Sequence, residues 1–82
     1  MQYHISMTRA EKMIDKMRNN PRDWRIADLT AIASRYGIVW RQNGTSHVQF
    51  VRDDGVSLTV PAHRPIKPVY VQKFLVFIEV YL

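Results

Sequence analysis

The sequence predicts an α+β domain in which helices pack on one face of a three-stranded antiparallel sheet. Three observations predict it. Apolar residues recur at helical spacing before residue 37, they alternate with polar residues from 38 to 60, and two turns divide the alternating part. The turns are Asn43-Gly44 and Asp53-Asp54-Gly55, both typical of hairpins. A sheet with one apolar and one polar face needs helices over the apolar face only.

A first helix is expected to begin near Thr8. Thr8-Arg9-Ala10-Glu11 has the spacing of a capping box, in which two side chains satisfy each other's backbone amides. Asn19-Asn20-Pro21 ends this helix, because proline cannot continue it. Its apolar stripe consists of Ala10, Met13, Ile14 and Met17. The methionines of this region can fill the core or contact a partner.

A second helix is expected to begin between Asp23 and Arg25 and to end at Gly37, a left-handed cap. Asp28 lies in its first turn, where a negative charge suits the helix dipole. We expect Trp24 to staple the start of this helix to the core or to the first helix. The apolar stripe is Ile26, Leu29, Ile32, Ala33 and Tyr36.

Three strands follow, at residues 38–42, 47–52 and 56–60. Strand alternation places Val48 and Phe50 on the apolar face. The inward side of the third strand is expected to consist of Val56, Leu58 and Val60, and Pro61 ends it. The same alternation places His47, Gln49, Ser57 and Thr59 on the polar face.

The segment after Pro68 favours a helix, because proline suits a first helical turn and the sheet still needs cover. Its β-branched residues would also suit a strand. The expected buried stripe is Val71, Phe74, Leu75 and Ile78. A second apolar side is formed by Val69, Phe77, Val80 and Tyr81. That excess indicates burial against a partner chain or against the first helix.

Composition limits the class of protein. The 82 residues suffice for one domain, and the absence of cysteine excludes disulfides and cysteine metal sites, as is typical of a reducing cytosol. No apolar run is long enough to span a membrane. Twelve Lys and Arg against seven Asp and Glu give a net charge of +5. That balance favours nucleic acid, an acidic membrane surface or an acidic protein as partner, or simply serves solubility.

The chemistry points to one histidine. The chain has no glycine-rich phosphate loop, no G-x-G-x-x-G, no H-E-x-x-H and no metal-ligand spacing around its histidines. RNA cleavage requires few catalytic groups from the protein, because the ribose 2′-hydroxyl is the nucleophile and histidine titrates near neutral pH. His47, where a turn opens into a strand, has a rigid support for such a role. The alternative is a histidine that only forms surface hydrogen bonds.

A family resemblance strengthens this assignment. From about Arg25 onward the chain resembles the HicA toxins of bacterial toxin–antitoxin pairs. The matching segments are Tyr36-Gly37, Arg41-Gln42-Asn43-Gly44-Thr45-Ser46-His47, Leu58-Thr59-Val60-Pro61-Ala62-His63 and Ile66-Lys67-Pro68. The G-x-S-H element before a strand, together with the later V-P-x-H segment, is the specific part of the match.

The resemblance implies an α-β-β-β-α fold similar to double-stranded-RNA-binding domains. Residues 1–82 would form one HicA-like domain, with residues 23–82 as the core and residues 1–22 as an added N-terminal helical extension. The resemblance also implies a cytoplasmic, metal-independent and cofactor-free endoribonuclease that cleaves mRNA and stops translation, with His47 as the catalytic residue. It also implies a HicB-type antitoxin that covers the active site and carries the DNA-binding part of the pair.

Six further residues are candidates for binding RNA around His47. They are Arg41, Gly44, Thr45, Ser46, Arg64 and Lys67. Each has a plain structural alternative: a generic hairpin glycine, hydroxyls that satisfy the turn, or solvated charges. Trp40 can stack on a base or belong to the core.

Two other functions stay open on the sequence. A small RNA-binding domain without nuclease activity needs only the basic charge and the fold. An interaction protein needs only the apolar last segment as a dimer surface.

Overall fold

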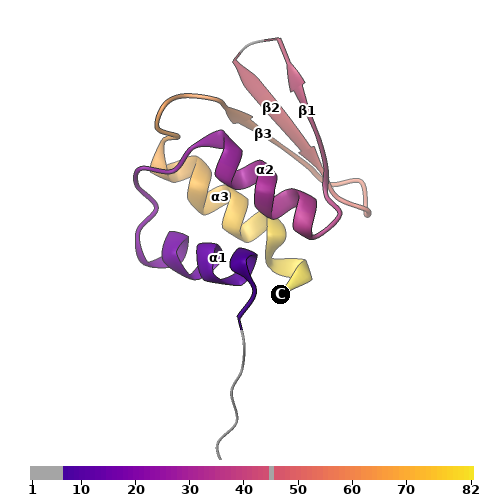
Figure 1. Cartoon of the computed structure of the whole chain (residues 1–82). Helices are drawn as coiled ribbons and strands as arrows, with labels where there is room; N and C mark the ends of the chain where they lie inside the picture. Colours follow the sequence, from indigo (N-terminus) through magenta and orange to yellow (C-terminus); the bar gives the residue numbers. More distant parts are fainter. Residues whose placement is uncertain (1–6, 45) are drawn as a thin grey trace, which may run out of the picture.

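The computed structural model describes residues 7–44 and 46–82, and it has three layers (Figure 1). A three-stranded sheet forms one layer, α2 and α3 cover one of its faces, and α1 lies on the far side of these two helices. The elements are α1 (Arg9–Asn19), α2 (Ile26–Arg35), β1 (Val39–Asn43), β2 (His47–Val51), β3 (Ser57–Pro61), α3 (Pro68–Ile78) and a short 3₁₀ turn, η1 (Glu79–Tyr81). The predicted α+β class with a three-stranded antiparallel sheet is confirmed.

The sheet is a meander in the order β1-β2-β3, with both pairs of strands antiparallel. Phe50 pairs with Trp40 on one side and Leu58 on the other, and this row faces the helices. The neighbouring row, Arg41, Gln49 and Thr59, faces away from them. The predicted polar face is therefore present, and we call it the open face.

The core lies between the sheet and the helices and extends under α1. Ile14 and Met17 of α1 are buried in the same cluster as Phe50 and Phe74, whose rings meet edge to face at 5.2 Å. The expected helical stripes supply most of the remaining members, including Leu29, Ile32, Ala33, Val71 and Ile78. No helix in the described ranges is both long and apolar enough to cross a bilayer.

Local sequence explains where the first two helices begin. The Thr8 amide donates to Glu11 Oε1 at 3.0 Å, and the Glu11 amide donates to Thr8 Oγ1 at 3.1 Å, so the predicted capping box is formed. The bond from the Thr8 amide lowers the pKa of the Glu11 carboxyl, because it favours the charged form. At α2 only one half of this arrangement is present, in which Asp28 Oδ2 accepts from the Arg25 amide at 2.9 Å.

Three sequence-based details were wrong. β1 begins at Val39 rather than at residue 38, because the Ile38 amide still donates to the Ala33 carbonyl at the end of α2. Val56 is 45% exposed instead of inward, since β3 begins only at the next residue. Phe77 is 6% exposed and belongs to the core, because it follows Phe74 by three residues and stays on the buried side of α3.

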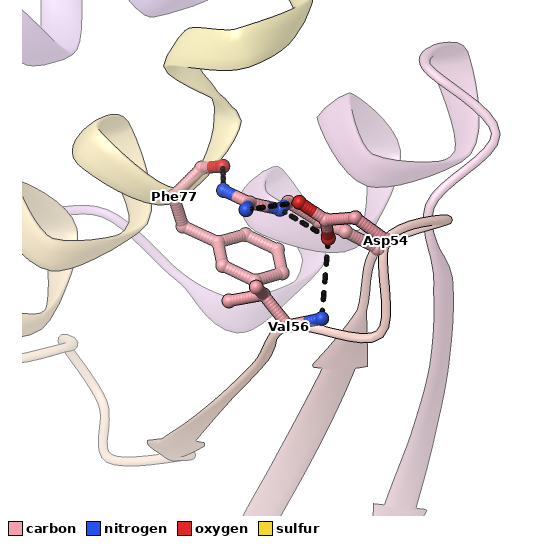
Figure 2. A network of polar contacts seen from close by, with 4 residues as sticks. Asp54, Val56 and Phe77 are labelled. Atoms are coloured by element: carbon pink, nitrogen blue, oxygen red, sulfur yellow. Dashed lines mark hydrogen bonds and ion pairs between the residues drawn. The ribbon is translucent and has the colours of Figure 1, made fainter.

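Arg52, just after β2, ties the second hairpin to α3 (Figure 2). Its guanidinium donates to the Phe77 carbonyl at 2.9 Å and to both carboxylate oxygens of Asp54, at 2.6 and 3.0 Å. It also lies 5.2 Å from the centre of the Phe77 ring. Asp54 Oδ1 accepts in turn from the Val56 amide at 3.1 Å, so one carboxylate orders the whole turn.

We predict that Met17→Ala lowers the free energy of unfolding by about 2–5 kcal/mol, because a fully buried side chain leaves a cavity. Met7→Ala is the matched control, since Met7 is 41% exposed and its loss should cost less than about 0.5 kcal/mol. Urea denaturation measures both. Equal effects would show that α1 is not part of the core.

We predict that Asp54→Asn lowers the unfolding midpoint at neutral pH and that this loss disappears in acid. Hydrogen bonds from the Arg52 guanidinium and the Val56 amide lower the pKa of Asp54 in the folded protein. The charged carboxylate therefore stabilises the fold above the unfolded-state pKa of about 3.9, and the benefit is lost as the pH falls through the lower folded-state pKa.

Thermal unfolding of wild type and Asp54→Asn between pH 2 and 7 tests this, with Asp53→Asn as control in the same turn. A difference between wild type and Asp54→Asn that persists unchanged at the lowest pH would contradict the role given to the charge.

Candidate functional site

His47 opens β2 at the end of the first hairpin, and its side chain is exposed. It is paired on both sides, with Asn43 of β1 and with Pro61 of β3, so its backbone is held in the middle of the sheet. Nδ1 of the ring lies 3.1 Å from Ser46 Oγ. The exposed imidazole therefore stands on a rigid support and has one ring nitrogen oriented by a hydroxyl.

Arg41 shares the open face with His47. Arg41 pairs with Gln49, which lies two residues along β2 from His47. Arg41 and His47 are therefore diagonal neighbours on one face, a spacing of about 7–8 Å that long side chains can bridge. The Arg41 guanidinium lies 3.5 Å from Gln49 Oε1, and the side chain is exposed. Thr59 completes the row on β3. The open face thus offers a cation and two neutral polar side chains next to the imidazole.

Gly44 in the first hairpin has φ +66°, the left-handed region that glycine enters without strain. A β-carbon added there would meet nothing within 4 Å, so the requirement for glycine comes from the backbone alone. Ser46 contacts the His47 ring through its hydroxyl, whereas the predicted site residue Thr45 lies outside the described residues. The turn places Gly44 and Ser46 on the chain directly before His47.

The connector after β3 lies beside the same end of the sheet. The Ala62 amide donates to the Ser46 carbonyl at 2.8 Å, which extends the β2–β3 ladder by one residue beyond His47. Ala62 also lines a hollow of about 370 Å³ whose basic side chains come from Arg25, His63 and Arg64. Arg64 therefore lies near the His47 end of the sheet, in a hollow that the start of α2 also lines.

Two predicted residues belong neither to the row of Arg41, Gln49 and Thr59 nor to the lining of the hollow. Lys67 is exposed and precedes the first turn of α3, where its carbonyl accepts from the Tyr70 amide at 2.9 Å. Trp40 faces the helices, and its Nε1 donates to Ser34 Oγ at 3.3 Å, which favours the packing role for this ring. Within residues 7–44 and 46–82, no group of three His, Cys, Asp or Glu side chains is arranged to hold a metal ion.

Arg25 is the residue of this region that sequence reasoning did not select. It precedes α2, far from His47 in the sequence, and the hollow brings it next to the connector. The Ile66 amide donates to the Trp24 carbonyl at 2.8 Å, which fixes the connector against the start of α2. Only the tertiary structure reveals that proximity, because no motif links the two segments.

Comparison of the chain with protein-family models, curated proteins and solved structures gave no match. The HicA resemblance accordingly stays a prediction that depends on the motifs around His47 and His63.

We predict that Gly44→Ala lowers the free energy of unfolding by about 1–2 kcal/mol, the cost of a side chain in a left-handed conformation. Gly44→Asn is the matched control and should cost less than half as much, because asparagine tolerates this conformation. Urea denaturation measures both. Equal costs for Ala and Asn would contradict a backbone requirement at the turn.

Proposed function

We propose that this protein is a metal-independent endoribonuclease that cleaves mRNA, and that it acts as a HicA-type toxin. The observation that carries the proposal is the exposed imidazole of His47, held by paired strands on a polar sheet face beside Arg41. The net charge of +5 favours a polyanionic substrate. We infer the HicA family and the toxin activity from the resemblance of the G-x-S-H and V-P-x-H segments.

In the proposed reaction, His47 removes the proton from a ribose 2′-hydroxyl. The 2′-oxygen attacks the adjacent phosphorus, the bond from phosphorus to the 5′-oxygen breaks, and a 2′,3′-cyclic phosphate and a 5′-hydroxyl form. Water supplies the proton to the leaving 5′-oxygen. We assign proton transfer to Nε2, because Nδ1 contacts Ser46 Oγ. Arg41 offsets the negative charge that grows on the phosphate oxygens.

The fold is compatible with this function. The order α2, three antiparallel strands and α3 is the order that the resemblance implies for a domain like those that bind double-stranded RNA. In this proposal α1 is the addition to that core, although its Ile14 and Met17 are buried in the common cluster. The RNA strand passes His47 and Arg41, and its flanking phosphates reach the hollow of Arg25 and Arg64.

A toxin of this kind needs a partner that restrains it. We propose a HicB-type antitoxin that covers the open face around His47, so that contact with DNA occurs only through the antitoxin. Because mRNA is the substrate, the proposed site of action is the cytoplasm. A gene for a HicB-like protein directly beside the gene for this chain is the simplest supporting observation.

We predict that His47→Ala lowers the rate of RNA cleavage by purified protein by about 10²–10⁴-fold, the usual contribution of a general acid or base. Binding of RNA by His47→Ala should remain, since phosphate contacts supply most of the affinity. Gel analysis of a labelled RNA gives the cleavage rate, and fluorescence anisotropy gives the dissociation constant. Expression of wild type, but not of His47→Ala, should arrest bacterial growth.

Arg41→Gln and Arg9→Gln form the matched pair for substrate binding. Arg41 lies on the open face, whereas Arg9 lies on α1, beyond the helices that cover the other face. Only Arg41→Gln should weaken binding of RNA.

Cleavage that persists in folded His47→Ala would refute catalysis by His47. Binding of RNA by wild type without any cleavage would identify a non-catalytic RNA-binding module instead.

A further inference from the structure

An apolar groove runs between β3 and α3, away from the His47 site. It has a volume of about 480 Å³ and is bounded by Val56 and Leu58 on the sheet side and by Val69, Lys73 and Val76 on α3. The three α3 residues recur at spacings of four and three, so they form one stripe of the helix. Val69 and Val76 are 47% and 68% exposed, which is unusual for valines that flank a core. We call this feature the β3 groove.

The backbone beside the groove is an open sheet edge. Among the residues that the structure describes, β3 pairs only with β2, and the hydrogen bonds at its two ends fix which residues face that strand. The Arg52 amide donates to Val56 at one end, and the Ala62 amide donates to Ser46 at the other. Because backbone groups alternate in direction along an antiparallel strand, the N–H and C=O groups of Ser57 and Thr59 point away from β2.

An open edge and an apolar groove along the same strand fit one kind of ligand. An extended peptide can add to a sheet edge through its main chain, and its alternate side chains then fill pockets beside that edge. We propose that β3 and the β3 groove bind an extended segment of a partner protein, in which apolar side chains alternate along the strand and acidic residues flank them. This proposal does not depend on ribonuclease activity.

Charge favours an acidic partner over a second copy of this chain. The described residues that line the groove include Arg52 and Lys73 but no carboxylate. Arg52 already donates to Asp54 and to the Phe77 carbonyl, so Lys73 is the cation at the rim, 5.5 Å from the Tyr70 ring. Two copies joined through β3 would pair two surfaces that both carry Lys73, on chains that each carry +5. The acidic residues of a partner segment are instead attracted to Lys73.

The groove is preorganised at its hairpin end. Asp54 holds the Val56 amide, and Arg52 links the same carboxylate to the Phe77 carbonyl of α3 (Figure 2). The spacing between the second hairpin and α3 is thereby fixed by contacts across the groove floor. A binding segment does not have to order these elements, which reduces the entropic cost of association.

The test is selection from a display library of random decapeptides on the full-length protein, followed by titration of the selected peptides. We expect peptides with alternating apolar residues and flanking Asp or Glu, and amide chemical-shift changes centred on Ser57, Thr59 and Val76. Val76→Lys should raise the dissociation constant by about tenfold or more, since a valine contact is lost and a charge is introduced. Val39→Lys is the matched control, because Val39 is equally exposed at 68% but lies on β1.

Lys73→Glu should weaken the acidic peptides and strengthen variants in which their acids are replaced by lysine. Failure to select any peptide, or chemical-shift changes that avoid β3 and α3, would overturn the proposal. Sedimentation equilibrium gives the remaining outcome: a dimer that dissociates on Val76→Lys would show that the occupant is a second copy, and would equally overturn it.

Discussion

The pairing of β2 on both edges is the constraint on which the other features depend. The central strand cannot rotate or slip without breaking two ladders, so its alternation assigns each side chain to a face. Val48 and Phe50 are thereby committed to the core, and His47 is committed to the open face. Burial of the two apolar residues holds the imidazole in place, although the imidazole itself contributes no apolar contact. The core residue Val48 and the candidate catalytic residue His47 are thus direct neighbours along a single strand.

The helices provide the apolar cover that this one-sided sheet requires. α2 and α3 lie directly on it, and α1 closes the space between them on the far side. Fifteen apolar residues are buried in the part of the chain that the structure describes, a small core, so each contributes a large share of the stability. Within residues 7–44 and 46–82, the same arrangement leaves one stripe of α3 without cover. That stripe lies next to β3, an edge strand of the sheet in this part of the chain.

Much of the fold was predictable because local signals agreed with the tertiary structure. The capping box at Thr8, the glycine at 37 and the two hairpin turns each placed a boundary within a residue or two. Phe77 was assigned to the wrong side because all faces of α3 are rich in apolar residues, so periodicity could not distinguish them. For the candidate site, a motif predicted His47, whereas Arg25 came from an unrelated segment. Its position depends on the packing of the connector against α2, which leaves no trace in local sequence.

The late position of α3 in the chain affects how the protein is made. The residues that complete the core, Val71, Phe74 and Ile78, leave the ribosome only after the whole sheet has emerged. Until then the nascent chain has one helix fewer than its apolar sheet face requires, and Phe50 lacks its aromatic neighbour. This domain therefore cannot complete its core until α3 has emerged. Exposed apolar surface and unpaired strand edges of this kind favour aggregation in incompletely folded chains.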